Sequence, residues 1–243
     1  MAQSDATKGQ GTVTVWRRLR RAFLFAIAAF LTLSIGLVVI YRFLPPPITP
    51  LMVIRLFQGE GLSKDWASYD EISPNVFKAV IAGEDARFCA HYGFDLEAIG
   101  NAIRHNKKSR RRHGASTITQ QTAKNVFLWP GGSFARKGVE AYFAVLLELF
   151  WDKRRILEVY VNVAEFGHGI YGVEAAAQAY YKKSAKDLTA EEAARLAAIL
   201  PSPLRRTPQR PGGADLSRIR AEMRNQPAPL NSRCPVGPYE DES

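Results

Sequence analysis

Residues 22–41 contain no charged side chain, and this uncharged run limits the possible folds more than any other feature of the chain. It reads AFLFAIAAFLTLSIGLVVIY. A helix needs about 20 apolar residues to cross the hydrocarbon core of a bilayer, which is about 30 Å thick. The run therefore predicts one membrane-spanning helix near the N-terminus.

The charges on either side of the run predict its orientation. Four arginines precede it within five residues, whereas only Arg42 follows closely before three successive prolines. Because positive charge is retained on the cytoplasmic side, residues 1–21 are expected to form a cytoplasmic basic tail, with the rest of the chain exported. A cleaved signal peptide is the alternative, but its apolar core is usually about 7–15 residues long and ends at small residues. We expect a retained single-pass anchor, residues 22–41, in the inner (cytoplasmic) membrane, with the exported part of the chain on the periplasmic side.

The composition narrows the class of partner. The 243 residues include 33 Lys and Arg against 23 Asp and Glu, a net charge of +10, and 47% are hydrophobic. The hydrophobic fraction is typical of a globular protein, and the charge implies a polyanionic partner. Because export removes the chain from nucleic acid, anionic lipid and pyrophosphate remain. The two cysteines are too few for a disulfide-dense fold or a four-thiolate zinc site.

The middle of the chain is predicted to be helical, because its apolar residues recur at intervals of three and four. The expected helices cover residues 73–88, 95–106, 117–127, 133–151, a segment through 156 and 160, 174–181 and 189–200. No convincing alternating strand is present, although a short hairpin in the loops stays open. We expect an all-α domain over 66–206, a linker over 42–65, and a Pro-rich, mobile tail over 207–243, except around 216–223.

The first cluster of polar residues follows an apolar run and reads Glu84-Asp85-Ala86-Arg87-Phe88, with His91 just beyond. A carboxylate at the end of such a run is partly desolvated, which raises its pKa and suits it to act as a general base. The alternative is an acidic pair on a solvated helix face. No histidine has HExxH or other metal-site spacing, and serine-hydrolase, dinucleotide and P-loop motifs are absent.

A second cluster, GASTITQQTAKN, covers residues 114–125. Thr117 and Gln120 have capping-box spacing, and free N–H groups at a helix start favour an anion. Ser116, Gln120 and Lys124 follow at steps of four, so they are expected on one helical face, where Lys124 would hold a phosphate. Ordinary capping with a solvated polar face is the alternative.

A third cluster places Arg136 and Lys137 within one helical turn of Glu140. It predicts a cationic cradle for pyrophosphate, in which Glu140 orders the lysine or binds a divalent ion; a surface ion pair is the alternative. Residues 104–113 hold six Lys or Arg and are expected to face anionic lipid headgroups, with a solvated loop or a nucleic-acid patch as alternatives.

In this order, the segments EDARFCAHYGFD, GASTITQQTAKN, RKGVEAYFAVLLE and KRRILEVYVN resemble glycosyltransferase family fifty-one over about residues 66–206. Enzymes of this family polymerise lipid II into peptidoglycan glycan strands. The chain is too short for an added transpeptidase domain and lacks a Ser-x-x-Lys motif, so it resembles the monofunctional members. The resemblance implies a lysozyme-like all-α glycosyltransferase domain that performs inverting transfer.

The resemblance also implies roles for single residues. Glu84 matches the general base that deprotonates the 4-hydroxyl of the acceptor sugar, and Glu140 matches the second acidic residue of the site. The implied substrate-binding residues are Asp85, Phe88, His91, Ser116, Thr117, Gln120, Gln121, Lys124, Asn125, Arg136 and Lys137. Lys124 would contact the donor pyrophosphate, assisted by Arg136 and Lys137. Gly132 departs from the pattern, since relatives often carry an arginine there near the pyrophosphate.

The expected partners are lipid II, the growing glycan strand and the membrane, with division or elongation proteins as candidates and no nucleic acid. The sequence does not require a cofactor, and whether a divalent cation (Mg²⁺ or Mn²⁺) binds at Glu140 is left open. Two alternatives also stay open. One is an anchored lysozyme-like hydrolase or lytic transglycosylase, which cleaves glycan. The other is a non-enzymatic scaffold, which leaves the glutamates unexplained.

Overall fold

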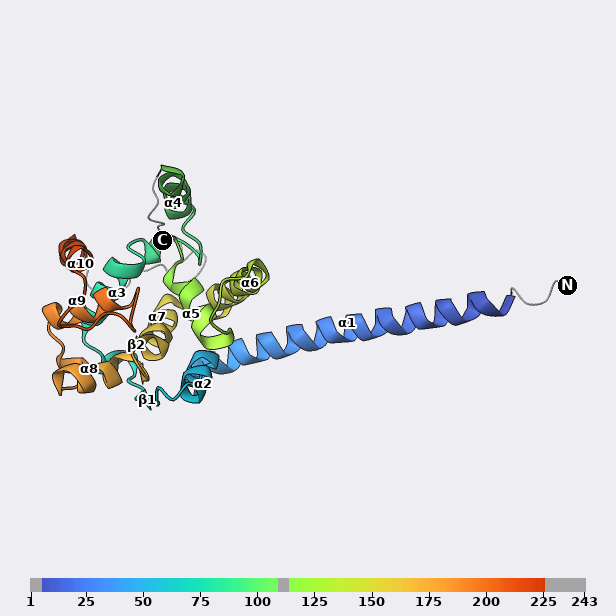
Figure 1. The fold of residues 1–243 in the computed structure, drawn as a ribbon, viewed down its shortest axis with the longest axis horizontal. Coiled ribbons are helices and arrows are strands. Elements are labelled where there is room, and N and C mark those ends of the chain that lie inside the picture. The colour runs from blue at the N-terminus through green and yellow to red at the C-terminus, as the bar shows by residue number, and fades with distance from the viewer. Residues whose placement is uncertain (1–5, 109–113, 226–243) are drawn as a thin grey trace, which may run out of the picture. The chain divides into compact units, whose positions relative to one another are not determined.

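The computed structural model describes residues 6–108 and 114–225, and it divides into two compact units, Met1–Phe43 and Leu44–Ser243. The first unit contains one continuous helix, α1 (Ala6–Phe43) (Figure 1). Its segment Val15–Phe43 is the one helix in the described part of the chain that is long and apolar enough to span a membrane. The predicted anchor over residues 22–41 lies within this segment.

The second unit is built almost entirely of helices, as predicted. Its α-helices are α2 (Pro50–Phe57), α3 (Pro74–Glu84), α4 (Leu96–Lys108), α5 (Ile118–Phe127), α6 (Phe134–Phe150), α7 (Lys153–Val163), α8 (Val173–Tyr181), α9 (Ala190–Ile199) and α10 (Gly213–Asn225). Short 3-10 helices are η1 (Tyr69–Glu71), η2 (Phe88–Ala90) and η3 (Ala185–Asp187). The strands are β1 (Ser63–Lys64), β2 (Glu165–Gly167) and β3 (Ile170–Tyr171).

Polar side chains fix where several helices begin. Ser73 caps α3 ahead of Pro74, and Ser133 caps α6 through the backbone N–H of Arg136. Thr117 starts α5 with a capping box, in which its hydroxyl accepts from Gln120 N and the Gln120 side chain accepts from Thr117 N. Each cap satisfies backbone donors that the first helical turn leaves unpaired. These starts agree with the sequence prediction.

The end of α3 differs from the prediction, which carried this helix through Phe88. The helix stops at Glu84, and Asp85 leaves the helical conformation with φ −160° and ψ 73°. The Asp85 carboxylate accepts hydrogen bonds from Ile118 N and His91 Nε2, both outside α3. These tertiary bonds pull the chain out of the helix, so Glu84 becomes its last residue.

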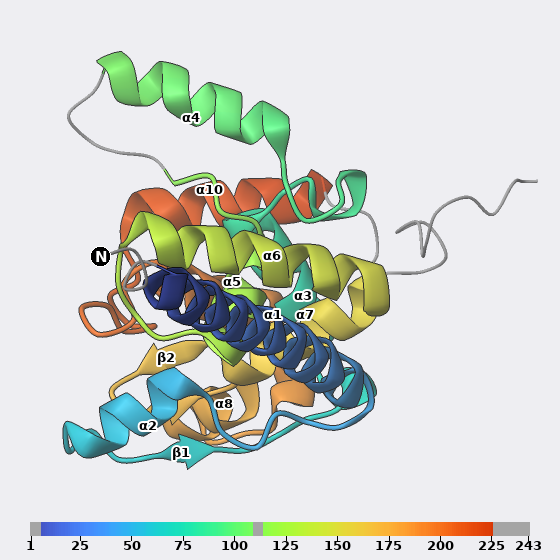
Figure 2. The ribbon, with the colours of Figure 1, turned by 90° about the vertical axis from the view of Figure 1, so that its right-hand side faces the viewer.

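The core forms around α5 and α3. α5 packs against α6 and α7, while α3 packs against α9 and α10 (Figures 1 and 2). Phe77, Leu147, Leu157 and Tyr160 are among the fully buried side chains. α4 projects from the body of this unit in both views, and none of its residues is buried. α3 and α5, which carry the first two motifs, are therefore each packed against two other helices.

A small sheet closes one end of the unit and includes the hairpin that the sequence left open. Its strand order is β1-β3-β2, with β1 parallel and β2 antiparallel to β3. Gly169 in the hairpin turn has φ +67°, and a Cβ there would lie 2.1 Å from the Glu60 carbonyl oxygen. Only glycine allows this approach.

Two expected domain boundaries need correction. The segment over 42–65, expected to be a linker, contains α2 and β1, and β1 pairs with β3. The expected domain end at residue 206 is too early, because α10 packs on α3 and α9 and buries Leu216 and Ile219. These buried apolar side chains lie in the stretch 216–223 that the prediction excepted from the mobile tail, and they stabilise a helix that extends beyond it at both ends. The expectation for 226–243, like the basic stretch 109–113, lies outside the described residues.

Candidate active site

Glu84 is the last residue of α3 and is half-buried. Its Oε2 accepts a hydrogen bond of 2.8 Å from Nε2 of Gln121, on α5. Burial raises the pKa of Glu84, and the bond from Gln121 and the charges of Arg218 and Lys124 oppose that rise. A carboxylate with a raised pKa that remains reachable is suited to accept a proton near neutral pH.

Asp85, the next residue, is buried and supports the start of α5. Its Oδ2 accepts a 3.0 Å hydrogen bond from Ile118 N, and its Oδ1 lies 2.9 Å from Nε2 of His91. A carboxylate at a helix N-terminus satisfies free N–H groups and interacts favourably with the helix dipole. Asp85 therefore joins the end of α3 to the start of α5, which fixes Glu84 relative to Lys124.

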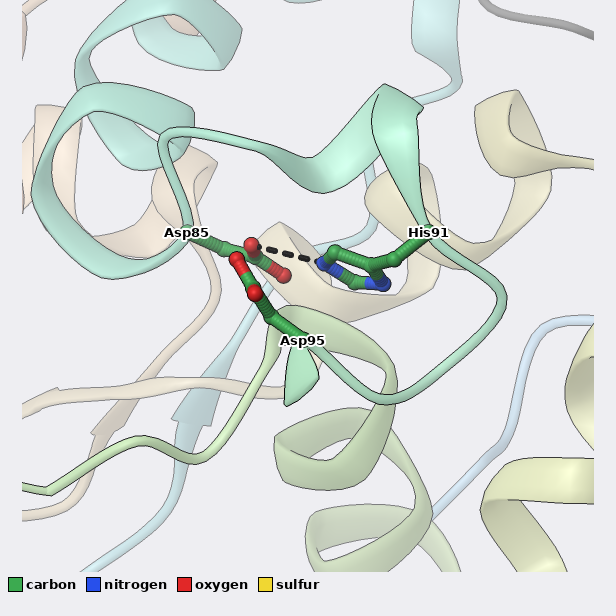
Figure 3. Close-up of side chains that lie close together, drawn as sticks. All are labelled: Asp85, His91 and Asp95. Carbon is green, nitrogen blue, oxygen red and sulfur yellow. Dashed lines mark hydrogen bonds and ion pairs between the residues drawn. The ribbon is translucent and has the colours of Figure 1, made fainter. Parts of the chain in front are cut away.

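Asp85, His91 and Asp95 form a cluster that the motif spacing did not suggest (Figure 3). One ligand atom from each lies within 4.8 Å of the others, which makes them candidates to hold a metal ion. The carboxylates already have partners, however. Oδ1 of Asp95 accepts from Ala98 N at 2.9 Å, and Oδ2 lies 3.8 Å from Nε of Arg87. These bonds explain the cluster as a support for the loop between α3 and α4.

A cavity of about 360 Å³, here called the cationic cavity, opens beside α5 and α6. Its charged lining consists of four cations and two carboxylates, from Arg55, Lys124, Arg136, Lys137, Glu140 and Glu165. Ser116, Gln121 and Asn125 add polar groups. The excess of positive charge in a partly enclosed space favours an anionic ligand.

The third motif forms a compact ion-pair network in this cavity. Nη1 of Arg136 donates to Oε2 of Glu140 at 2.8 Å, and Nζ of Lys137 donates to Oε1 of the same carboxylate. Lys137 also donates to Oγ of Ser116 at 3.1 Å, which ties α6 to the start of α5. Because each oxygen of Glu140 already accepts from a cation, a divalent ion would compete with Arg136 and Lys137 for this carboxylate.

Lys124 differs from the other cations of the cavity. In the described residues it forms no ion pair, and burial lowers its pKa while Glu140 acts in the opposite direction. A half-buried ammonium without its own counterion gains most from a bound anion, because the anion replaces the solvation that burial removed. Lys124 is therefore well placed to bind an anionic ligand.

A second cavity of about 220 Å³, here called the glutamate cavity, is lined by Glu84, Asp85, Arg87, Asp95 and the segment 114–117. Ser116 lines both cavities. Gln121 lines the cationic cavity and bonds Glu84. Glu84, the candidate base, thus lines the glutamate cavity and lies next to the cationic cavity.

Two other predicted site residues, Phe88 and Gln120, lie behind these surfaces. Phe88 is fully buried, 4.5 Å beneath the ammonium of Lys153, and Gln120 is buried in the capping box, so neither lines the two cavities. Thr117 donates to the Gly93 carbonyl at 2.6 Å. The expected polar face through Ser116, Gln120 and Lys124 is therefore wrong at Gln120. Ser116 precedes the helix, and the cap turns Gln120 inward.

The sequence reading missed several residues of the site. Arg55 on α2 and Glu165 on β2 line the cationic cavity and bond each other at 3.1 Å. Arg218 on α10 donates to the carbonyls of Ala82 and Gly83 beside Glu84. No motif marks them, and they reach the site only through the fold. Gly132 is exposed, while Arg55 and Arg136 supply guanidinium groups to the cavity.

The comparison with protein families identifies the class of protein. The transglycosylase family model matches residues 52–225, which include all described helices of the second unit except the first two residues of α2. The match covers most of the chain, and the chain belongs to this family. Its N-terminal and C-terminal limits agree with the inclusion of α2 and α10 in the domain.

Its relatives specify the activity further. A biosynthetic peptidoglycan transglycosylase of Caulobacter vibrioides is 56% identical over 199 residues, 81% of this chain and 86% of the relative. Proteins of the same name from Bdellovibrio bacteriovorus and Rhodospirillum centenum are 51% and 47% identical over 220 residues. They cover 88% and 90% of this chain, and 88% and 92% of their own lengths. The chain is a peptidoglycan glycosyltransferase of cell wall biosynthesis.

Proposed function

We propose that this enzyme polymerises lipid II into β-1,4-linked glycan strands and releases undecaprenyl pyrophosphate. The observation that carries the proposal is the position of Glu84, a half-buried carboxylate beside a cavity with a net positive lining. A base next to a pyrophosphate site is what glycosyl transfer from a pyrophosphate donor requires.

In the proposed reaction, Glu84 accepts the proton of the 4-hydroxyl of the lipid II acceptor in the glutamate cavity. The oxygen attacks the anomeric carbon of the growing strand, and the bond from that carbon to the pyrophosphate breaks with inversion. The leaving pyrophosphate carries the released electron pair into the cationic cavity. Because this leaving group is already a stable anion, it needs charge stabilisation more than protonation by a second acid.

Three cations are proposed to stabilise the leaving group: Lys124, Arg136 and Lys137. Lys124 lacks a counterion among the described residues, whereas Glu140 holds Arg136 and Lys137 in place. A preorganised cationic cradle needs little rearrangement when negative charge develops on the pyrophosphate. Three more of the implied contacts, those of Ser116, Gln121 and Asn125, fit because these residues line the same cavity.

We further propose that α1 holds the enzyme in the inner membrane as a single-pass anchor. The basic residues before the apolar segment retain the N-terminus in the cytoplasm and expose the catalytic domain on the periplasmic side. Lipid II and the growing strand both carry membrane-inserted lipid chains. An anchored domain therefore meets its substrates at the surface where they are confined.

Glu84→Gln tests the base directly. This variant is expected to lower kcat for polymerisation of purified lipid II by about 10²–10⁴-fold, because the amide cannot accept the proton. Glycan products resolved by gel electrophoresis measure the loss. Incubation of the wild type with isolated cell wall separates synthesis from the hydrolase alternative. Release of fragments from the wall without polymer from lipid II would reject the proposal, as would a variant of normal activity.

Thermal unfolding provides the control for the fold of Glu84→Gln. A carboxyl group with a raised pKa in the folded state favours folding below its ordinary pKa, and that contribution is lost as pH rises through the raised value. The variant, which cannot ionise, is therefore expected to melt at the wild-type temperature near pH 4 and above it near pH 8. A melting temperature at or above that of the wild type, together with lost activity, assigns the defect to chemistry.

A further inference from the structure

Tyr160, in the interior of α7, reaches the base through one intermediate side chain. It is 1% exposed, and its hydroxyl donates to Oε1 of Gln121 at 3.2 Å. The amide nitrogen of Gln121 donates in turn to Oε2 of Glu84 at 2.8 Å and lies 3.5 Å from the Ser116 carbonyl. The three side chains connect α7, α5 and α3.

The chemistry of these groups determines which way the amide faces. An ionised carboxylate and a backbone carbonyl only accept hydrogen bonds, so Glu84 and Ser116 both require the NH₂ side of Gln121. The amide oxygen then faces Tyr160, which has to donate. Burial raises the pKa of Tyr160 well above its ordinary value, so the hydroxyl keeps its proton and remains a donor.

We infer that Tyr160 is a positioning residue for the base: its hydroxyl holds the Gln121 amide with the NH₂ group toward Glu84. This inference rests on the proposed role of Glu84. A reversed amide would place its oxygen against the carboxylate, an arrangement that is stable only when Glu84 is protonated. Protonated Glu84 cannot accept a proton from the acceptor hydroxyl, so the orientation of the amide controls how much enzyme is active.

Other groups also act on Glu84, and each comes from an element packed around it. Lys124 lies on α5, and Arg218 and Asp215 lie on α10; the two cations favour the ionised form and Asp215 opposes it. Tyr160 on α7 acts differently, because it is neutral and bonds Gln121 rather than Glu84. Its removal should therefore change the protonation of Glu84 without removing a charge from the site.

Tyr160→Phe tests the inference in the full-length protein, with kcat/KM for lipid II polymerisation measured against pH. The acidic limb of the profile is expected to move up by about 0.5–1 pH unit, because the amide loses the donor that orients it. Activity then falls up to about tenfold below the limb and approaches the wild type above it. Tyr180→Phe is the matched control, since this hydroxyl bonds the Phe166 carbonyl and should leave the profile unchanged.

Gln121→Met shows whether the hydroxyl acts through the amide. This variant is expected to shift the limb in the same direction, and the double variant Tyr160→Phe/Gln121→Met should shift it no further. An equal loss for Tyr160→Phe at every pH would mean a structural role and overturn the inference, as would an unmoved limb or an additional shift in the double variant. If Tyr160→Phe fails to fold, Gln121→Met carries the test alone, and an unmoved limb overturns the inference.

Glu84→Gln distinguishes failure of this inference from failure of the proposed function. If Glu84→Gln polymerises lipid II normally, the proposed function fails, and the inference fails with it. If Glu84→Gln is inactive while Tyr160→Phe has the wild-type profile, only the role of Tyr160 is rejected.

Discussion

At the scale of single residues, the site contains two groups of opposite charge, Glu84 and Lys124, and burial removes part of the water around each. Burial raises the pKa of Glu84 and lowers the pKa of Lys124. Each group is therefore shifted toward its neutral form, and each opposes the shift of the other. A bound pyrophosphate would favour the charged form of Lys124, while the neighbouring acceptor hydroxyl supplies the proton that Glu84 can take.

Lys124→Met tests the cation while keeping most of the side-chain volume. The expected result is a fall in kcat of about 10²–10³-fold with a smaller change in KM, because the charge acts mainly when negative charge develops on the leaving group. Steady-state polymerisation of lipid II provides the measurement, and Lys124→Arg should retain more activity than Lys124→Met.

Lys186→Met is the matched control, because Lys186 is an exposed lysine of η3 that lines neither cavity. It should behave as the wild type. A kcat for Lys124→Met within tenfold of the wild type would argue against a role for Lys124 at the pyrophosphate.

At the scale of elements, α10 supports the end of α3 that carries the base. Arg218 donates to the carbonyls of Ala82 and Gly83 at 3.0 and 3.1 Å, which are among the unpaired acceptors of the last turn of α3. Ile219 packs against the same turn, since a Cβ at Gly83 would lie 3.2 Å from its Cδ1. A helix far along the chain thus holds Glu84 in place.

Arg218→Ala is expected to destabilise the domain by about 1–2 kcal/mol, because the two carbonyls lose a charged donor. It should also move the acidic limb of the activity profile to higher pH, since Arg218 favours ionised Glu84. Thermal unfolding and kcat/KM against pH measure the two effects. Arg220→Ala is the control: this exposed residue of α10 pairs with Glu191, and its loss should cost less than about 1 kcal/mol. Equal changes in stability and in the pH profile for Arg218→Ala and Arg220→Ala would contradict the role of Arg218.

At the scale of the whole molecule, the anchor and the catalytic domain are separate compact units. The first residues after the boundary at Phe43 are bonded to the second unit itself. Arg155 donates to the Leu44 carbonyl, and Lys64 donates to the Pro47 carbonyl at 2.9 Å. The catalytic unit therefore contains its own core and its own site, and the proposed role of α1 is to confine the enzyme to the membrane.

Removal of residues 1–43 is expected to leave the thermal unfolding of the catalytic unit within about 2 °C of the full-length protein in detergent. Polymerisation of lipid II in micelles should persist, whereas polymerisation in liposomes should fall at least tenfold, because the anchor raises the local concentration of enzyme at the bilayer. Equal activity of both proteins in liposomes would contradict this division of roles.

Sequence patterns determined the features that depend on local physics. The uncharged run predicted the anchor, and the capping-box spacing at Thr117 predicted where α5 begins. Helical periodicity predicted helix starts at 73 and 189, where Ser73 and Thr189 cap α3 and α9. Motif order predicted the family and brought Glu84, Lys124 and Glu140 into one hypothesis. These signals are readable because hydrophobic length and capping chemistry act over a few neighbouring residues.

Tertiary structure decided the features that depend on distant partners. α3 ends at Glu84 because Asp85 bonds His91 and the start of α5. Arg55 and Arg218 reach the site from two other helices with no pattern to mark them, and Tyr160, within the segment KRRILEVYVN, reaches Gln121 only through the packing of α7. Local sequence defines a helix and its cap, but burial and long-range hydrogen bonds determine which of its side chains face the substrate.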